Sequence, residues 1–459
     1  MQKQKFITTD KGFYVSLVRL ALPIALQYLV SFLITLTNSI SIGRLGKEAT
    51  ASAYTGTLIF TVLQMLITGV ESGMTVASSR NFGERNNGKI KKITAIGTFL
   101  IFLLGAITSI LSFFLPHLFI SLFLGENSNS AAAEYLRIIS FSFPLFCLSG
   151  ALGASMKSIE SPKITAAASG VAFLINLMLN YLLVFGNLGF SALGIKGSAI
   201  ATLIARAAEL SILLIYVFLV DKKLCLSVRS FLKFDRATSV EFLKYTAPLF
   251  LGQVIWIINT LFASYLLSAL HSVEVVVGLA VANTLNSLAY ILMNGTSSAV
   301  GIIIGKTIGE NEIGKIKIYS YTTQIIFILL GIMTSISIFA VKNTFISIYS
   351  IGEDAQRIAK SLVSVLAVTA IGTSYQSACL TGLVKSGGDV SFVLKNDAFF
   401  VFLVVIPLSV ISFRLGAPEW LIFLALKSDQ LLKCIPAAIK INRFGWIKEL
   451  NGKSKKIYQ

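Results

Sequence analysis

Long apolar runs separated by short polar stretches make up most of this chain of 459 residues. A helix needs about 20 predominantly apolar residues to cross the hydrocarbon core of a bilayer, and the runs reach that length. They predict twelve helices at residues 15–42, 50–78, 91–115, 131–158, 163–186, 197–220, 240–270, 275–303, 316–342, 356–384, 390–414 and 416–441. The polar stretches between them are too short for a separate domain. The pattern therefore predicts an all-α integral membrane protein.

Composition excludes a soluble enzyme. Hydrophobic residues form 55% of the chain and charged residues 13%, with a mean hydropathy of +0.80, whereas soluble proteins carry about 25% charged residues. The chain has two histidines, His117 and His271, and four scattered cysteines. Two histidines and four scattered cysteines are too few to form a zinc site or a proton relay. We predict no enzymatic activity, no metal centre and no cofactor.

The distribution of the charged residues along the chain explains the net charge of +18. An even number of helices puts both termini on one side, and 28 of the 39 Lys and Arg residues fall in segments on that side, against seven opposite. Basic residues accumulate in cytoplasmic segments. We expect a multi-pass protein of the plasma (inner) membrane with both termini cytoplasmic. The charge then contacts anionic lipid headgroups of the bilayer, not nucleic acid, and Trp446 with the tail lysines is expected at the same surface.

The chain repeats itself. Residues 69–91 align with 295–317 at a spacing of 226, where they share Gly69, Gly83, Glu84 and the run 88–91. Pro23 and Pro248 lie 225 apart. We predict an N-lobe at 1–220, a cytoplasmic linker at 221–239, a C-lobe at 240–441 and a basic cytoplasmic tail at 442–459. Two pseudo-symmetric six-helix lobes around a cavity are typical of secondary transporters that work by alternating access.

Four short motifs carry a family resemblance. They are IGRLG at 42–46, VKSGGD at 384–389, the pair Asn176 and Asn180 followed by LLVFG, and GIKGSAIAT at 194–202. In their order and spacing the chain resembles the multidrug and toxic compound extrusion (MATE) transporters, within the multidrug/oligosaccharidyl-lipid/polysaccharide exporter superfamily. The resemblance implies twelve helices, cytoplasmic termini and export of small amphipathic organic compounds or drugs by antiport against H⁺ or Na⁺.

The chain departs from the family's ion sites. One branch of the family has aspartates where this chain has Asn38 and Asn180. The other has acids in the seventh and tenth helices, where this chain has none between Pro248 and Leu270 or from Ile358 to Val384. With Asn176 and Thr202, these asparagines offer neutral oxygens that could ligate Na⁺ but cannot carry a proton. The alternative is that they hydrogen-bond across helices and bind no ion.

Charged residues inside predicted helices need a partner or a function. Two oppositely charged pairs at helical spacing predict ion pairs, Arg206 with Glu209 and Asp429 with Lys433. Glu71 and Asp397 have no partner at such a spacing. We hypothesise that they are replacement proton carriers. The alternatives are a water-facing Glu71 and an Asp397 paired with a basic residue of another helix.

Aromatic and amide side chains on helices one, seven and ten supply candidate substrate contacts, because such groups suit flat amphipathic ligands. These candidates are Gln27, Tyr28, Gln253, Trp256, Asn259, Tyr375 and Gln376. Packing between helices is the alternative interpretation of the same residues.

The sequence thus predicts a secondary exporter that functions as a monomer. The alternative within transport is a flippase for a lipid-linked saccharide. With few acidic candidates, the charge of the substrate stays open.

Overall fold

The computed structural model describes residues 6–124, 130–227, 230, 235–270, 273–349 and 351–448. These residues are almost entirely helical, and their only β pairing is an isolated antiparallel bridge between Gly388 and Ile447. Eleven helical segments are long and apolar enough to cross a membrane. The predicted all-α membrane fold is confirmed.

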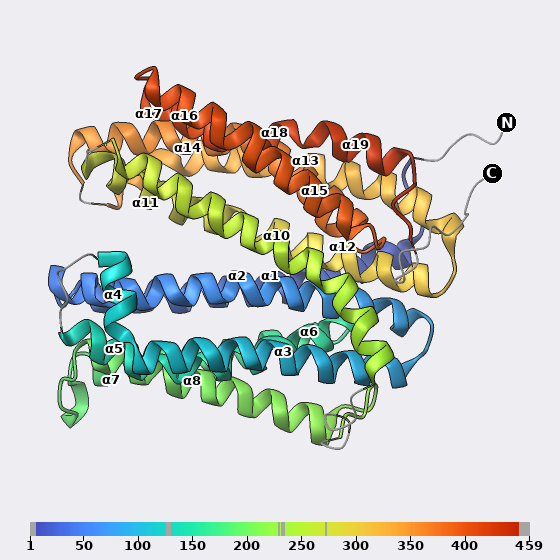
Figure 1. Cartoon of the computed structure of the whole chain (residues 1–459), viewed down its shortest axis with the longest axis horizontal. Helices are drawn as coiled ribbons and strands as arrows, with labels where there is room; N and C mark the ends of the chain where they lie inside the picture. The colour runs from blue at the N-terminus through green and yellow to red at the C-terminus, as the bar shows by residue number, and fades with distance from the viewer. Residues whose placement is uncertain are drawn as a thin grey trace. The chain divides into compact units, whose positions relative to one another are not determined.

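The described residues of the first half of the chain form ten helical elements (Figure 1). They are α1 (Lys11–Gly43), α2 (Lys47–Gly83), α3 (Asn87–Phe114), α4 (Pro116–Leu124), α5 (Ser130–Ser140), α6 (Ser142–Ser158), α7 (Pro162–Leu183), η1 (Asn187–Gly189), α8 (Ile195–Ile215) and η2 (Tyr216–Val220). The short α4 was not predicted. It begins at Pro116, which suits the first turn of a helix because it has no N–H to leave unpaired.

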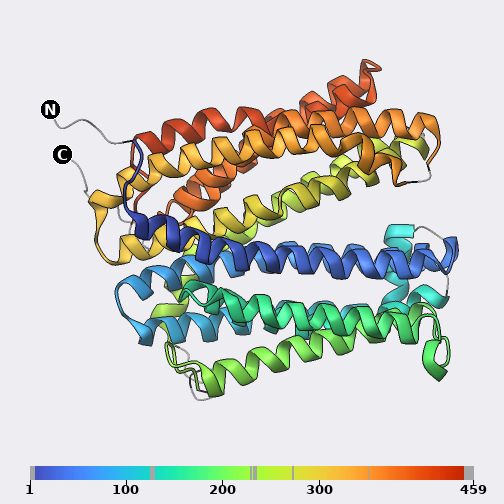
Figure 2. The same cartoon turned by 180° about the vertical axis from the view of Figure 1, so that it is seen from behind.

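The second half contains twelve elements (Figure 2). They are α10 (Arg236–Ser268), α11 (Val273–Ala289), α12 (Ile291–Gly309), α13 (Ile313–Ser347), α14 (Glu353–Gln376), η3 (Ser377–Val384), α15 (Val390–Phe400), η4 (Val401–Val405), α16 (Ile406–Arg414), α17 (Glu419–Leu426), α18 (Asp429–Leu432) and α19 (Cys434–Asn442).

Three of the predicted spans are broken. The fourth is divided between α5 and α6, the eighth between α11 and α12, and the twelfth among α17, α18 and α19. The twelfth is therefore absent from the eleven continuous candidates, although its residues are helical over most of 419–442. No glycine or proline stands at the break at Tyr290, so the sequence pattern alone did not reveal it.

The chain divides into two compact units. We call Leu26–Thr246 the N-unit, and Met1–Ala25 together with Ala247–Gln459 the C-unit. The boundaries fall inside α1 and α10, close to Pro23 and Pro248, which lie inside these two helices. Proline removes a backbone hydrogen bond within a helix. The start of each of these helices therefore belongs to one unit and its remainder to the other.

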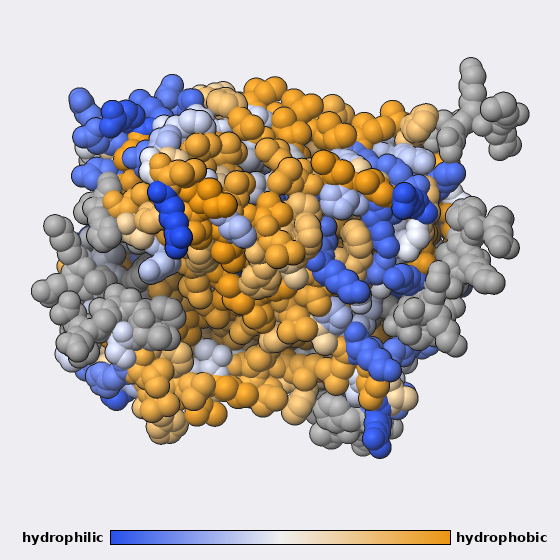
Figure 3. Space-filling model, turned by 45° about the horizontal axis from the view of Figure 1, so that its top comes forward, coloured by the Kyte–Doolittle hydropathy of each residue, from blue (hydrophilic) through white to orange (hydrophobic). Residues whose placement is uncertain are grey.

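Each unit has its own apolar core. In the N-unit, α7 packs along α8 and α3 along α6, and a buried cluster joins them with the segment after η2. In the C-unit, α13 packs along α14 and the start of α1 joins a large cluster with α12 and η3. Many apolar side chains remain exposed on the outer helix surfaces. Figure 3 shows them covering the middle of the visible helices, with hydrophilic residues toward the ends, as expected for contact with lipid.

The internal repeat is visible in the backbone. After α2, Arg85 adopts a positive φ of 56°, and Asn311, exactly 226 residues on, has φ 60° after α12. In both turns the next residue donates its N–H to a carbonyl five residues back: Asn86 to Asn81 at 2.8 Å, and Glu312 to Thr307 at 3.1 Å. The aligned sequences therefore end their helices with the same turn.

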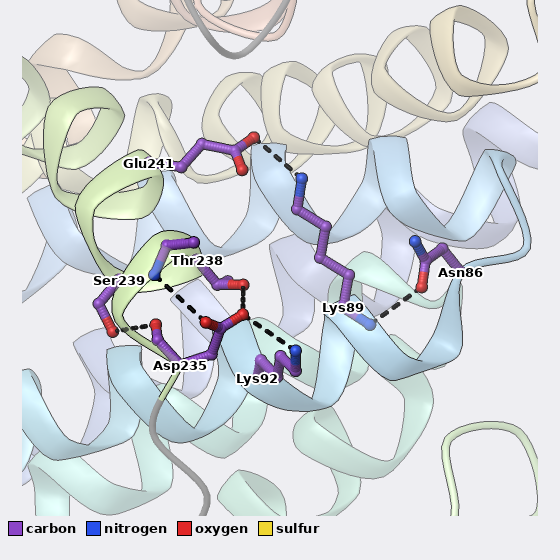
Figure 4. A network of polar contacts seen from close by, with 8 residues as sticks. Asn86, Lys89, Lys92, Asp235, Thr238, Ser239 and Glu241 are labelled. Atoms are coloured by element: carbon purple, nitrogen blue, oxygen red, sulfur yellow. Dashed lines mark hydrogen bonds and ion pairs between the residues drawn. The ribbon is translucent and has the colours of Figure 1, made fainter.

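The segment between the repeats is anchored to the N-unit. Lys223 Nζ donates to the carbonyl of Ile159 at 2.9 Å and to Ser161 Oγ at 2.9 Å. At the other end, Asp235 accepts from Lys92 at 3.0 Å and from Thr238 at 2.7 Å (Figure 4). The hydrogen bonds from Thr238 and Lys92 lower the pKa of Asp235 to about 2.

A second ion pair lies one turn further along α10. Lys89 Nζ lies 2.9 Å from Glu241 Oε1 (Figure 4). The first turns of α10 are therefore tied to the start of α3, within the N-unit. Residues 228–229 and 231–234 of the predicted linker lie outside the described residues.

The segment after α19 corrects one expectation. Trp446 was expected at the lipid surface, but its side chain is fully buried and donates to the carbonyl of Ile441 at 3.1 Å. It packs on Gly387, where a Cβ would lie 2.0 Å from the indole. Two adjacent glycines leave room for the ring and for the bridge to Ile447. The tail beyond residue 448 lies outside the described residues.

The turn that packs against Trp446 also contains a buried charged residue. Asp389, buried at the end of the SGGD motif, pairs with Lys440 at 2.6 Å and Lys448 at 2.8 Å. Burial alone would raise the pKa of Asp389, but hydrogen bonds from the two lysines outweigh it and hold the pKa below 3.8. The motif thus anchors the end of the described chain.

Both ends of the described chain meet α13. Tyr319 Oη donates to Asp10 Oδ2 at 2.6 Å, and Gln324 Nε2 donates to Asn442 Oδ1 at 3.4 Å. These contacts lie within the C-unit, about a turn apart along α13. The two ends therefore lie at the same end of that unit.

Candidate functional site

The asparagines of the N-unit form one cluster with Thr202. Asn38 of α1 donates to Thr202 Oγ1 at 3.0 Å, and Asn180 of α7 donates to Asn38 Oδ1 at 3.0 Å. Asn176, one turn before Asn180, donates to Thr202 at 3.4 Å and accepts from Asn180 at 3.2 Å. The structure therefore brings together four predicted site residues from three helices.

Most polar atoms of this asparagine cluster are already satisfied within it. Thr202 also donates to the carbonyl of Ser198 at 2.9 Å. One oxygen, Asn180 Oδ1, is buried without a hydrogen-bond partner. A cation would find that oxygen, but no carboxylate among the cluster's members to balance its charge. In this arrangement the cluster serves mainly to link α1, α7 and α8.

A cavity of about 160 Å³ opens beside the cluster, within the N-unit. It is lined by Ile34, Thr35, Asn38, Ser39, Ile42, Thr50, Ala53, Gly56, Thr57, Phe60, Tyr135, Ile139, Thr202 and Arg206. Among these described lining residues none is acidic. The cavity is mostly apolar with one cation, Arg206.

Arg206 pairs with Glu209, as predicted, at 2.7 Å. Ser169 Oγ of α7 donates to the other oxygen of Glu209 at 2.6 Å, which fixes the carboxylate. The guanidinium carbon lies 4.7 Å from the ring centroid of Phe146 and 5.7 Å from that of Phe60, distances suited to cation–π contact. The side chain is 5% exposed, so this is a buried, oriented cation.

Glu71 lies elsewhere in the N-unit, on α2. Its carboxylate lies against α6 at Gly150, where an added Cβ would approach Oε1 to 2.2 Å. Lys157 of α6 acts on it electrostatically, without an ion pair. Within the described residues Glu71 has neither an ion pair nor a hydrogen-bond partner. It is partly buried and stays a candidate proton carrier.

The C-unit contains a larger cavity, of about 320 Å³. Four of the predicted site residues line it: Gln253 and Trp256 of α10, Gln376 of α14 and Asp397 of α15. Lys385 and Gln430 also line it. The cavity thus combines aromatic, amide and charged groups from separate helices.

Asp397 is engaged by a buried lysine. Lys433 Nζ lies 2.8 Å from Asp397 Oδ1 and 3.1 Å from Asp429 Oδ2, and Lys433 has no exposed surface. Its ammonium also lies 4.7 Å from the Trp256 ring centroid. The predicted pair of Asp429 with Lys433 is present. The alternative interpretation of Asp397, pairing with a basic residue of another helix, is what the structure shows.

Four other candidates do not line either cavity. Gln27 and Tyr28 lie on α1 in the N-unit, with Tyr28 39% exposed. Asn259 is buried on α10 with an unpartnered Oδ1. Tyr375 turns to α13 and donates to Gln324 Oε1 at 2.7 Å. For Tyr375 the structure supports the interpretation as packing between helices.

The cations of the two cavities were not predicted from the sequence. The spacing of Arg206 and Glu209 predicted only an ion pair, and Lys385 was not among the predicted site residues. A usable signal was present for Arg206, which follows Thr202 by four residues on α8 and therefore shares its helix face. Lys433 approaches Asp397 across 36 residues, a contact that no local pattern reveals.

Curated relatives match at low identity. The chain is 25% identical over 366 residues to "Probable multidrug resistance protein NorM" of Thermotoga maritima, covering 76% of this chain and 75% of that protein. It is 25% identical over 303 residues to "Probable multidrug resistance protein YoeA" of Bacillus subtilis, with 64% of each protein covered, somewhat less than two thirds.

Solved structures share the fold. A transporter of the MOP superfamily from Pyrococcus furiosus, whose binding pocket is described as reversed in polarity, superposes with a TM-score of 0.83 at 19% identity, covering 96% of this chain and 98% of the other. The Vibrio cholerae MATE transporter VcmN gives a TM-score of 0.81 at 16% identity, with 94% and 97% covered.

A match to a protein-family model assigns the chain to a family. The MatE model matches residues 23–182 and again residues 248–411, one match in each sequence repeat. Together these segments span well over half of the chain. The resemblance seen in the sequence motifs is confirmed, and the chain belongs to the MATE family of multi-pass membrane transporters.

Proposed function

We propose that this protein is a secondary active exporter of small amphipathic organic compounds, drugs included. The observation that carries the proposal is the C-unit cavity, in which Trp256, Gln253 and Gln376 converge from two membrane-spanning helices. An aromatic face with hydrogen-bonding amides recognises flat amphipathic molecules. Membership of the MATE family and the names of its relatives support the same function, and the flippase alternative is not favoured.

Transport by alternating access is the second part of the proposal. Pro23 and Pro248 stand in equivalent positions of the two helices that are shared between the units. Each removes a backbone hydrogen bond where its helix passes from one unit to the other. Such sites allow a helix to bend. Bending there would let the two units change their arrangement during transport.

Coupling to H⁺ through Glu71 is the third part. Asp397 is held by Lys433, and the asparagine cluster contains no ionisable group. Glu71 is a membrane-embedded carboxyl group with no cationic partner at ion-pair distance among the described residues. Such a group is the one best placed to take up and release a proton. Coupling to Na⁺ at Asn176, Asn180 and Thr202 is the competing possibility, supported by the single orphan oxygen of Asn180.

The proposed setting is the plasma membrane, with the protein acting as a monomer. Both described ends lie at the same end of the C-unit. The surplus of Lys and Arg on the side of the termini supports their placement in the cytoplasm. Exposed apolar side chains on the outer helices would contact the lipid bilayer.

Transport by proteoliposomes tests the proposal. Purified protein is reconstituted, and movement of a fluorescent amphipathic dye is followed with a pH gradient, a Na⁺ gradient or neither. We expect movement against the dye's own gradient only when an ion gradient is present. Correctly inserted protein that moves no dye under any gradient would contradict the proposal, and lipid-linked saccharides would then be the next substrates to test.

A further inference from the structure

The N-unit cavity has a charge opposite to that expected for a site that binds organic cations. Arg206 lines it, and none of its described lining residues is acidic. The two aspartates that one branch of the family has nearby are Asn38 and Asn180 here. Glu209 balances the charge of Arg206, but the guanidinium presents only hydrogen-bond donors, which favour an anionic ligand over a cationic one at this wall.

Arg206 has hydrogen-bonding capacity that the protein does not use. Its Nη1 donates to Glu209, but its Nε–H is buried without a partner. A buried donor without an acceptor destabilises the protein by roughly 1 to 3 kcal/mol. The guanidinium borders the cavity at 5% exposure, so an acceptor entering the cavity could relieve this penalty.

Three threonine hydroxyl groups of the cavity wall do not compete for this role. Thr35 Oγ1 donates to the carbonyl of Ser31, Thr50 to that of Gly46 and Thr57 to that of Ala53. Their protons are therefore used within their own helices. The strongest unsatisfied donor identified at the cavity wall is the guanidinium of Arg206.

The equivalent cation of the C-unit is different. Lys433 follows Arg206 by 227 residues and also stacks on an aromatic ring, but two carboxylates neutralise it. Arg206 is paired with a single carboxylate, which Ser169 also binds. Arg206 therefore retains a hydrogen-bonding capacity that Lys433 uses within the C-unit.

Cavity size limits the ligand. A cavity of about 150 Å³ accommodates one benzene-sized ring, and this one measures about 160 Å³. Phe60 and Tyr135 supply aromatic walls. We infer that the N-unit cavity binds the aromatic carboxylate end of anionic or zwitterionic substrates, with Arg206 as the residue that determines specificity. This inference rests on the proposed function and narrows its substrate class.

Binding of three matched probes tests the inference without transport. The probes are benzoate, benzamide and benzylammonium, which share one benzene ring and differ in charge. Each is dialysed to equilibrium against the full-length protein in nanodiscs, with empty nanodiscs to subtract partition into lipid. We expect benzoate to bind at least tenfold more tightly than the other two.

A double variant, Arg206→Gln with Glu209→Gln, removes the cation without leaving a buried acid unpaired. We expect the preference for benzoate to fall below twofold, with benzamide binding unchanged. Arg206→Lys keeps the charge but lacks Nε, so it should lose part of the preference. Arg19→Gln, at an exposed position on α1, is the matched control and should change nothing.

Three results would overturn the inference: tightest binding of the ammonium probe, a preference for benzoate that survives in the double variant, or no binding of any probe. In each case, gradient-driven export of a cationic or neutral dye would leave the proposed function standing. Loss of all transport with benzoate binding intact would instead contradict the proposed function alone.

Discussion

At the scale of single residues, Lys433 combines full burial with two acidic partners. Replacing it with methionine strips both Asp397 and Asp429 of their counter-ion, whereas Asp397→Asn leaves Lys433 paired with Asp429. Removing one partner of a buried pair destabilises by about 3 to 5 kcal/mol. We expect Lys433→Met to reach that range and Asp397→Asn to fall below it.

Thermal unfolding of Lys433→Met and Asp397→Asn in the same detergent shows which variant is less stable. Asp354→Asn is the control, because its pair with Arg357 is exposed and such pairs contribute less than about 1 kcal/mol. An Asp397→Asn variant that unfolds earlier than Lys433→Met would show that the carboxylate, not the lysine, organises this site.

Asp389 gives a prediction that depends on pH. Its pKa in the folded protein lies below 3.8, the value for the unfolded chain. Its stabilising effect is thus complete well above pH 3.8 and is lost as the pH falls through the folded pKa. Because hydrogen bonds to charged groups contribute roughly 1.5 to 3 kcal/mol, Asp389→Asn should destabilise the protein by about 2 kcal/mol at pH 7.

The check is a pair of thermal unfolding series from pH 7 to pH 3 for the wild type and Asp389→Asn. The gap between the two should narrow below about pH 4. A gap that stays constant across the range would mean that the ion pairs with Lys440 and Lys448 do not act as the structure indicates.

Sequence reasoning recovered local chemistry at this scale and missed most of the long-range contacts. The spacing of Arg206 and Glu209 predicts their ion pair because residues three apart share a helix face. The contact of Asp397 with Lys433 joins separate helices, and the burial of Trp446 depends on a return of the chain to Gly387. The periodicity of apolar residues along the chain predicts neither the Asp397–Lys433 contact nor the burial of Trp446.

At the scale of the element, close packing of α12 against the start of α1 depends on Gly295. A Cβ at this position would lie 2.7 Å from the backbone nitrogen of Ala25 and 2.8 Å from its Cα. Backbone atoms cannot swing aside as a flexible side chain can. We expect Gly295→Ala to force the helices apart and to destabilise by roughly 1 to 3 kcal/mol, the usual range for overpacking.

Gly170→Ala is the matched control, since it lies inside α7 with open space around it. Alanine is the better helix former, so this variant should unfold at the wild-type temperature or slightly above. Equal unfolding temperatures for the two variants would contradict the close approach of α1 and α12.

The positions of the helices were predictable, and their interruptions only in part. Apolar length predicts each span because lipid requires a continuous apolar helix. The break at Phe141 lies three residues before Pro144, which cannot donate a hydrogen bond to the carbonyl of Ser140. No proline or glycine stands at the break at Tyr290. That α2 and α12 end in the same kind of turn could be predicted, because the sequences of the two turns align.

At the scale of the whole molecule, three features support a proton-coupled exporter. One family model matches twice, each unit has its own cavity, and Glu71 is the membrane carboxyl group without an ion-pair partner among the described residues. If Glu71 couples transport to the proton gradient, its replacement should abolish accumulation but leave exchange of substrate across the membrane. Neutralising a coupling carboxyl removes the link to the gradient and not the substrate site.

The most direct test compares wild type and Glu71→Gln in proteoliposomes, under an imposed pH gradient and in substrate counterflow without any gradient. Glu84→Gln, an acid at the end of α2, serves as the control. We predict that Glu71→Gln loses accumulation driven by the pH gradient but retains counterflow near the wild-type rate, which a misfolded protein would lose as well. Undiminished gradient-driven accumulation in Glu71→Gln would contradict proton coupling through this residue.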